Sequence, residues 1–456
     1  MAALAVARGA VDRRGGSGDG ALAGRPTTPS GGYRRWVTSI ASTETEPGER
    51  SVRELLADPT FGRYFTANLI SNCGNWIQNV SAATAVFSIT RSATLTGVVS
   101  GALWLGSLVL QPYAGALSDR VDRRRMLLAG QSLALLAATV LAVWTALAGV
   151  DGLAGPWPII GVTVVIGIGN AVAIPAMQAL VPALVPSADL DQAIALNSVT
   201  FTLGRAIGPV LAAGVLLLGG PRLGFVVNAM TFLPLVVVLL VIRQRDVERS
   251  GDTDGSVREV LRLVRGDRRL LVLLAATTAI GWTSDPINTL SPPMADLFGA
   301  GDALVGVFVG CFGGGAALHS VVLRRTRTRF GQRRLGVFGL AGFGGGMVLF
   351  GLSPTPWLAA ASLVLAGFAF LGAITSVTTR MQRGITEDVR GRVMALWGVT
   401  FLGSRPIAAL VNGATADLVG VRAAVVAAAF VALAGAGLLA WYGGPSSSAD
   451  DRPGAG

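Results

Sequence analysis

The chain has 456 residues, of which 52% are hydrophobic and only 14% are charged, and its mean hydropathy is +0.59. A soluble globular domain usually carries about 25% charged residues. A chain of this length with so few charges cannot hide its apolar residues in one soluble core. The composition therefore indicates an integral membrane protein, and the 61 glycines agree, because glycine lets membrane helices approach closely.

The net charge of +11 is compatible with nucleic-acid binding, but the placement of arginine in membrane loops, described below, explains it better. Cys73 and Cys311 lie in apolar segments without metal-ligand spacing, and His319 is the only histidine. A zinc site and a histidine-based catalytic triad are therefore not expected. The sequence has no phosphate-binding P-loop, so we expect no direct use of ATP. We also expect no cofactor and no nucleic-acid partner.

The first half of the chain predicts a tail followed by six spans. Residues 1–50 are rich in Gly, Ser, Thr and Pro and predict a disordered cytoplasmic tail, and Ser51–Phe65 predicts a short amphipathic surface helix. About 20 apolar residues cross a bilayer as a helix, so the spans are located between charged residues. They are expected at 64–90, 92–118, 126–150, within 152–188 after the turn at 155–158, at 193–218 and at 223–242.

The second half repeats this pattern after an Arg-rich cytoplasmic linker, 243–269. Its spans are expected at 270–293 with Asp285 inside, at 303–323, at two places within 335–379 on either side of the turn at 353–356, at 393–415 and at 423–442. A disordered tail, 443–456, follows. We predict an all-α polytopic membrane protein with twelve transmembrane helices, in an N-terminal bundle (51–242) and a C-terminal bundle (270–442).

Arginine is distributed unevenly over the loops between these spans. With the N-terminus in the cytoplasm, the cytoplasmic loops hold 22 arginines and the outer loops hold only Arg91, Arg222 and Arg422. Cytoplasmic loops of membrane proteins carry an excess of basic residues. The sequence therefore predicts a multi-pass protein of the bacterial inner membrane with both termini in the cytoplasm.

An internal repeat links the fifth and eleventh spans. Residues 199–201 and 399–401 both read Val-Thr-Phe, and each is followed by an arginine, Arg205 or Arg405, and an isoleucine at the same spacing. The offset is 200 residues throughout, at the place where a duplication of six-helix halves predicts it. Parallel repeats of this kind are typical of secondary transporters.

The loop after the second span reads GALSDRVDRRR and places an acidic residue and an arginine cluster at the cytoplasmic face. It resembles motif A of the major facilitator superfamily, roughly G-x-L-a-D-r-x-G-r-r, with Asp122 where glycine is usual. The matching residues are Gly115, Leu117, Asp119, Arg120, Arg123 and Arg124. The resemblance implies two pseudo-symmetric six-helix halves, and an acid that bridges to a neighbouring helix and favours one conformation. The alternative is a basic loop that only orients the chain.

The resemblance covers nearly all of residues 55–440 and is specific for the exporter branch that includes macrolide and enterobactin efflux proteins, not for a substrate. It is carried by segments 61–78, 175–186, 195–209, 225–234 and 387–396. Gly204, Gly208 and Pro209 resemble the exporter-associated motif C, although alanines replace its last two glycines. Close helix packing and a bend at Pro209 are the structural interpretation of these residues.

An unusual stripe of amides runs along the first span. Asn68, Asn72, Asn75 and Asn79 follow spacings of four, three and four residues, which places them on one narrow helix face. Amides that face lipid are costly, so this face is expected to meet a water-filled cavity or another helix. Substrate contact and interhelical hydrogen bonding are both compatible with the pattern.

Three charged residues lie inside predicted spans: Arg205, Asp285 and Arg405. Charges at this depth are expensive and mark functional sites by default. Asp285 is the only acid well inside a span and is the candidate proton site, although Pro286 leaves open that it lies at the outer mouth. The two arginines either bond to carbonyl groups or attract an anionic substrate.

Together these features predict a secondary transporter rather than an enzyme. We expect a monomeric, alternating-access exporter of drug-like or siderophore-like molecules, driven by proton antiport. Its expected partners are the small-molecule substrate, protons and the lipid bilayer. The alternatives are an uptake permease of the same fold and a non-transporting membrane receptor or scaffold.

Overall fold

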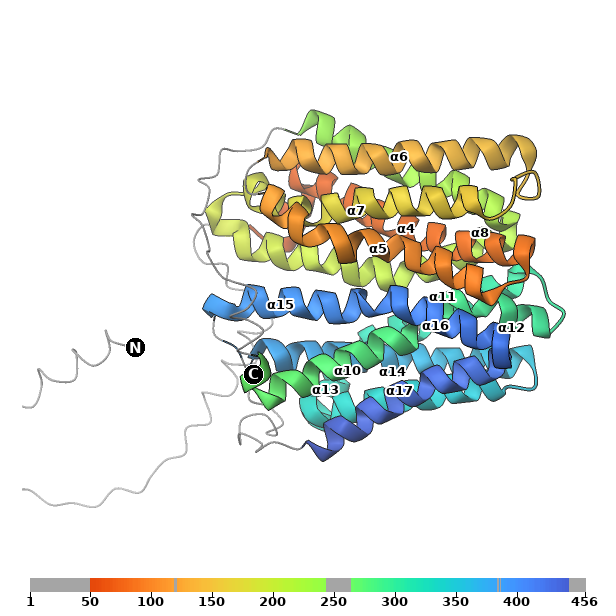
Figure 1. Cartoon of the computed structure of the whole chain (residues 1–456). Helices are drawn as coiled ribbons and strands as arrows, with labels where there is room; N and C mark the ends of the chain where they lie inside the picture. Colours follow the sequence, from red (N-terminus) through yellow and green to blue (C-terminus); the bar gives the residue numbers. More distant parts are fainter. Residues whose placement is uncertain (1–49, 119–120, 243–263, 384, 386, 443–456) are drawn as a thin grey trace, which may run out of the picture. The chain divides into compact units, whose positions relative to one another are not determined.

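The computed structural model describes residues 50–118, 121–242, 264–383, 385 and 387–442. Over these residues the chain forms α-helices with short connections and one 3₁₀ turn, and no strand is found among them (Figure 1). The predicted tails, up to residue 49 and from residue 443, and residues 243–263 of the predicted linker lie outside the described part of the chain.

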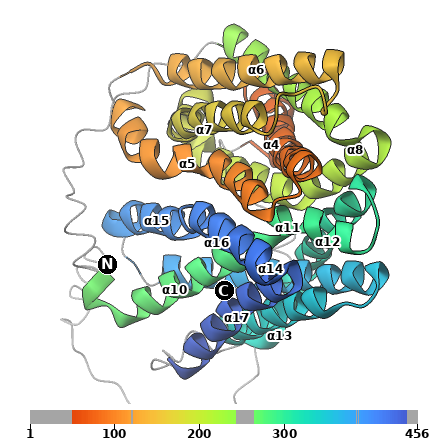
Figure 2. The same cartoon turned by 45° about the vertical axis from the view of Figure 1, so that its right-hand side comes forward.

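The N-terminal helices gather in one bundle, which Figures 1 and 2 both show. The elements are α3 (Val52–Ala57), α4 (Phe61–Thr90), α5 (Ala93–Ser118), α6 (Arg123–Ala148), α7 (Trp157–Leu184), the 3₁₀ turn η1 (Ser187–Asp189) and α8 (Leu190–Val241). The backbone of α8 leaves helical values at Gly219 and Gly220, so this element contains two spans.

The C-terminal helices form a second bundle (Figure 2). They are α10 (Arg268–Ser284), α11 (Pro286–Thr289), α12 (Ser291–Leu297), α13 (Asp302–Leu352), α14 (Pro356–Arg383), α15 (Glu387–Leu402), α16 (Ser404–Val419) and α17 (Val421–Trp441). α13 also contains two spans, which meet at Gly331 with a φ of 72°.

Eight of the described helical segments are long and apolar enough to cross a bilayer. They are 123–148, 157–184, 207–241, 268–289, 302–323, 325–352, 356–383 and 421–441. The other passes are α4, α5, the start of α8 and the pair α15–α16; amides in α4 and charged residues in α15–α16 lower their hydropathy. The order of helices and breaks is consistent with the twelve predicted spans, and the all-α polytopic fold is confirmed.

Close backbone approach holds α4 against the second part of α8. A Cβ atom built on Gly74 would lie 1.8 Å from the hydroxyl oxygen of Thr231, and one on Gly224 would lie 1.9 Å from that of Ser81. Small residues at such contacts let membrane helices gain van der Waals contact along their length. The tight pairing of α4 with α8 places the amide stripe of α4 against polar groups of α8.

An aromatic cluster fills the centre of the C-terminal bundle. Phe308 packs edge-on against Phe350 with ring centroids 5.2 Å apart, and Phe370 contacts Phe312 at 5.3 Å and Phe343 at 5.5 Å. These separations lie in the range preferred by aromatic pairs. The cluster joins α13 to α14 and leaves α10–α12 and α15–α16 to form the polar part of the bundle.

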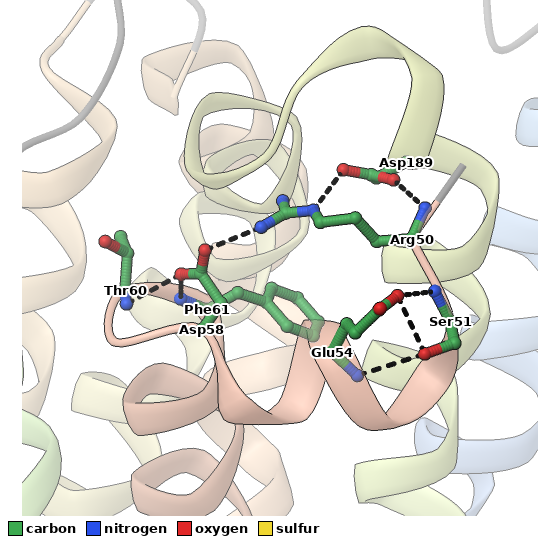
Figure 3. Close-up of polar contacts among 7 residues, drawn as sticks. All are labelled: Arg50, Ser51, Glu54, Asp58, Thr60, Phe61 and Asp189. Carbon is green, nitrogen blue, oxygen red and sulfur yellow. Dashed lines mark hydrogen bonds and ion pairs between the residues drawn. The ribbon is translucent and has the colours of Figure 1, made fainter. Parts of the chain in front are cut away.

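The predicted surface helix over Ser51–Phe65 was wrong in its extent. α3 ends at Ala57 and α4 begins at Phe61. Asp58 precedes Pro59, and a residue before proline is pushed out of the helical region, which fits its extended backbone. The carboxylate of Asp58 then accepts hydrogen bonds from the backbone N–H groups of Thr60 and Phe61 at the start of the new helix (Figure 3).

Candidate functional site

Asp285 lies at a break in the first span of the C-terminal bundle. Pro286 lacks a backbone N–H, so α10 cannot continue regularly, and α11 starts directly after Asp285. One carboxylate oxygen accepts a hydrogen bond from the Thr289 hydroxyl at 3.0 Å, and the other accepts one from the Asn412 amide at 3.0 Å. The side chain is buried. α10 is 17 residues long, so Asp285 lies roughly 25 Å along the span from its start.

Arg405 occupies the second position of α16 and is also buried. Its guanidinium donates a hydrogen bond to the hydroxyl oxygen of Ser284 at 3.2 Å, directly beside Asp285. Two aromatic rings face it, Phe401 at 4.9 Å and Trp104 at 5.1 Å from the guanidinium carbon. Because Trp104 belongs to α5, this cation–π contact connects the charged part of the C-terminal bundle with the N-terminal bundle.

The elements that meet here can link protonation to helix packing. Asn412 and Thr289 hold the carboxylate of Asp285 between α16 and α11. A protonated carboxyl group gains an O–H donor and loses part of its capacity as an acceptor. Binding of a proton at Asp285 would therefore rearrange the hydrogen bonds that join these two elements.

Most of the amide stripe of α4 faces other helices of its own bundle. Asn68 is buried and donates to Asn197 at 3.4 Å and to Thr200 at 3.3 Å, both on α8. Asn72, half-buried, donates to the backbone carbonyl and side chain of Asn68. Asn75 accepts a hydrogen bond of 3.0 Å from Asn170 of α7. The last member of the stripe, Asn79, is buried.

The described arginines of motif A donate to backbone carbonyls of neighbouring helices. Arg123 donates to the backbone carbonyl of Ala179 in α7 at 3.1 Å. Arg124 donates to the carbonyls of Leu239 and Leu240, the latter at 2.6 Å, in the last turn of α8. The carbonyls of Leu239 and Leu240 lie at a helix C-terminus, where carbonyls lack intrahelical partners and carry partial negative charge, so Arg124 stabilises them.

The rest of motif A is only partly described. Asp122 caps α6 by accepting from the backbone N–H of Arg125 at 2.8 Å. Gly115 and Leu117 lie in the last turns of α5, and Asp119 and Arg120 lie outside the described residues. The predicted bridge from Asp119 to a neighbouring helix therefore stays a prediction.

The motif C-like residues of α8 lie against α4. A Cβ atom on Gly204 would come within 3.0 Å of Asn72, and one on Gly208 would come within 2.7 Å of the Trp76 ring. Pro209 is buried in the same helix. Arg205 belongs to α8 as well, but its side chain lies outside the part of the structure that is described.

A contact joins the two bundles at the end where α4 turns into α5. The carboxylate of Asp417 in α16 accepts hydrogen bonds from the hydroxyl of Ser92 and from the backbone N–H groups of Ala93 and Thr94, each at 2.9 Å. These N–H groups open α5, so Asp417 caps a helix of the other bundle. An ion pair between Arg91 and Asp296 of α12 lies at the same end.

Sequence reasoning did not identify the partners that complete these sites. Asn412, Trp104 and Ser92 are ordinary polar or aromatic residues in sequence, and each is more than 100 residues from the group it meets. Asp417 carried a weak signal as an acid at the edge of a span. No group of three or more His, Cys, Asp or Glu side chains with metal-binding geometry occurs among the described residues.

Two helical bundles that meet through α5 and α16, each with polar groups inside its spans, define a secondary transporter of the major facilitator superfamily. The family of transmembrane secretion effectors matches residues 54–453, and the chain belongs to it. The predictions of a major facilitator efflux-type transporter and of a non-enzymatic function are thereby confirmed.

Characterised proteins and solved structures agree with this assignment. The staphyloferrin A transporter of Staphylococcus aureus is 22% identical, over 78% of this chain and 90% of its own length. The enterobactin exporter of Salmonella paratyphi A is 25% identical, over 86% of this chain and 91% of its own.

The fold is shared with an inward-facing bacterial homologue of the human lysosomal transporter Spinster, at 14% identity and a TM-score of 0.69, over 84% of this chain and 96% of that one. A D-xylose–proton symporter matches at 13% identity and a TM-score of 0.68, over 83% of this chain and 97% of the symporter.

Proposed function

We propose that this transporter exports small organic molecules of the siderophore or drug-like class in exchange for protons. The observation that carries the proposal is the buried carboxylate of Asp285, which is hydrogen-bonded between α11 and α16 beside an arginine that contacts the other bundle. The names of two relatives, a staphyloferrin A transporter and an enterobactin exporter, support siderophores as the cargo class. The motif C-like residues favour export.

The mechanism follows from the hydrogen bonds of this site. When Asp285 is charged, its two oxygens hold α11 and α16 together, and α16 carries Asp417, which closes one end of the protein. Protonation removes part of this acceptor capacity and weakens the α11–α16 connection. A shift of a few kcal/mol between two states is enough to exchange the side from which the substrate path is open. Substrate and proton would then move in opposite directions.

Reconstituted protein tests the proposal directly. Purified protein in liposomes, under an imposed pH gradient, should move iron-free enterobactin against its concentration gradient and carry protons the opposite way. Control liposomes without protein, and liposomes without a pH gradient, should show neither flux. Movement of enterobactin and protons in the same direction would identify an uptake permease, and absence of any flux with enterobactin or staphyloferrin A would contradict the proposed cargo.

We also propose that both termini and residues 243–269 face the cytoplasm, based on the 22 arginines of the predicted inner loops and the three of the outer loops. Single cysteines at Gly251 and Gly299, in a chain whose Cys73 and Cys311 are replaced by serine, should react with a membrane-impermeant reagent from opposite sides. Labelling of both from outside intact cells would contradict this orientation. We infer that a single chain is the working unit, because it contains both bundles, and the mass of the solubilised protein tests this.

A further inference from the structure

A surface groove of about 460 Å³ runs where α3, α4 and the second part of α8 meet. α4 supplies one wall from Arg63 to Ile70, and α8 supplies the opposite wall around Pro234 and Val238. A neighbouring hollow continues the groove past Arg63 to the end of α8 at Ile242. The groove lies on the outside of the N-terminal bundle, away from Asp285 and from the α5–α16 contact.

The groove is positively charged at one end and lined mainly by apolar side chains along the rest of its length. Ile70 lies seven residues beyond Arg63 in α4, which is roughly 10 Å along the helix. Exposed apolar side chains flank the groove, including Ile70, Val237 and Val241. Arg63 lies two residues after the start of α4, at the level where the span enters the bilayer, so the apolar part lies at the depth of lipid chains.

The charge at the cationic end is not neutralised by the protein. Arg63 is exposed and makes no hydrogen bond or ion pair with any residue of the described chain. Asp58 lies in the same wall, but its oxygens are occupied: one by the guanidinium of Arg50 at 2.8 Å, the other by the N–H groups of Thr60 and Phe61 (Figure 3). Arg63 is therefore the uncompensated charge of the groove.

A second acid fixes Arg50 in this position and so shapes the wall formed by α3. The buried Asp189 of η1 accepts from the backbone N–H of Arg50 at 2.8 Å and from its guanidinium at 2.7 Å (Figure 3). The backbone bond from Arg50, opposed by burial and reinforced by the guanidinium, holds the pKa of Asp189 below its usual value. Asp189 therefore stays charged at neutral pH and remains bound to Arg50. Its carboxylate is not available to pair with Arg63.

We propose that this groove binds an anionic phospholipid, with the phosphate on Arg63 and an acyl chain along Ala67, Ile70, Pro234 and Val238. A phospholipid is the molecule of the bilayer that places negative charge at the surface and a hydrocarbon chain directly beneath it. A zwitterionic lipid would fill the same apolar length, but its own cation would offset the attraction to Arg63. The site is thus a lipid site selective for headgroup charge.

Native mass spectrometry of the full chain tests this selectivity without reference to transport. The protein is solubilised with equal amounts of phosphatidylglycerol and phosphatidylcholine of the same chains, and retained lipids are counted. The intact chain should retain mainly phosphatidylglycerol. In Arg63→Gln this preference should fall about fivefold, because one arginine near an anionic surface contributes about 1 kcal/mol. Arg63→Lys, which keeps the charge, should restore most of it.

Two further variants separate the groove from general surface charge. Arg53→Gln removes an exposed arginine of α3 that does not line the groove, and its lipid preference should match that of the intact chain. Val238→Trp fills the groove and should lower retention of both lipids. Three results would each overturn the proposal. They are an equal loss of the phosphatidylglycerol preference in Arg53→Gln and Arg63→Gln, an unchanged phosphatidylglycerol preference in Arg63→Gln, and no preference between the two lipids in the intact chain.

Discussion

The first span of each bundle holds the polar groups in a different way. α4, in the N-terminal bundle, is an uninterrupted helix of 30 residues whose buried polar side chains are amides and hydroxyls. The equivalent span of the C-terminal bundle is divided into α10, α11 and α12 around the Asp285–Pro286 step. Its central polar group is a carboxylate, with Arg405 close beside it.

The two bundles therefore differ in whether the polar groups of their first spans can titrate. Amides such as Asn68 and Gln78 bond to neighbouring helices but cannot change charge, so their contacts are the same at every pH. Asp285 carries a titratable carboxyl group at a point where the helix is already broken. In the mechanism that we propose, its protonation moves helices of the C-terminal bundle against the N-terminal bundle.

The largest expected effect comes from making the two spans alike. Asp285→Asn leaves an amide where the carboxylate was, and should abolish gradient-driven accumulation of enterobactin while downhill exchange continues. Liposomes loaded with substrate and given or denied a pH gradient measure the two activities separately. Asp191→Asn, which removes an exposed acid from the first turn of α8 and touches neither Asp285 nor the contact between the bundles, is the matched control and should still accumulate substrate.

The alternative outcome is equally informative. If Asp285→Asn pumps normally, the carboxylate is structural and the contrast between the two spans concerns packing only. Coupling would then reside in an acid at the edge of the membrane, Asp119 or Asp417, or in an ion other than the proton.

The contact between the bundles gives the next largest effect. Asp417→Asn replaces one acceptor oxygen by a donor that faces the N–H groups of Ala93 and Thr94. Losing a hydrogen bond to a charged group costs about 1.5–3 kcal/mol. The conformation in which this end is open should therefore become at least about tenfold more populated. Distances between spin labels at Asp151 and Gly299 would report it. An unchanged distance distribution would show that the other contacts suffice to close this end.

Rigidity of the N-terminal bundle can be tested through α4 and α8. Gly208→Ala places a methyl group against the Trp76 ring, and overpacking of this kind costs roughly 1–3 kcal/mol of unfolding free energy. Gly214→Ala, six residues further along α8, meets open space and should be neutral or stabilising. Thermal unfolding of both variants in detergent gives the comparison. Equal stability of the two would mean that α4 and α8 separate easily.

The smallest effect is expected for the amide stripe. Asn68→Leu removes two long hydrogen bonds to Asn197 and Thr200 and the acceptor of one hydrogen bond from Asn72. Polar contacts between membrane helices contribute only about 0.6 kcal/mol on average. Transport should keep its proton dependence, with a slight loss of thermal stability. If instead the variant is as stable as the intact chain but no longer binds enterobactin, the stripe contacts substrate.

Much of the fold was predictable because charge is expensive in lipid. Gaps between charged residues located the spans, and prolines at 354 and 356 correctly separated α13 from α14. The predicted surface helix was too long, since an amphipathic pattern across 51–65 does not reveal that α3 ends just before Asp58, whose carboxylate then binds N–H groups at the start of α4. The local sequence pattern predicts the positions of apolar segments well, but it predicts poorly where each helix begins and ends.

The candidate site was predictable only in its charged members. Asp285 and Arg405 were recognisable because each interrupts an apolar segment. Asn412 and Trp104 were not, because an asparagine or a tryptophan in a span is unremarkable until the fold brings it to a charge more than 100 residues away. Whether the amides of α4 face a cavity or a helix also depends on neighbours that a single helix pattern does not specify.

The junction at Gly331 bears on how the protein is made. Two spans of α13 meet there without a loop, and a φ of 72° with a ψ of 164° is a conformation that essentially only glycine adopts. Six arginines between 324 and 334 surround this turn. With these arginines in the cytoplasm, as we propose, we expect the two spans to enter the membrane together as one hairpin whose arginine-rich tip stays on the side of synthesis. A substitution at Gly331 is then expected to impair insertion of the nascent chain.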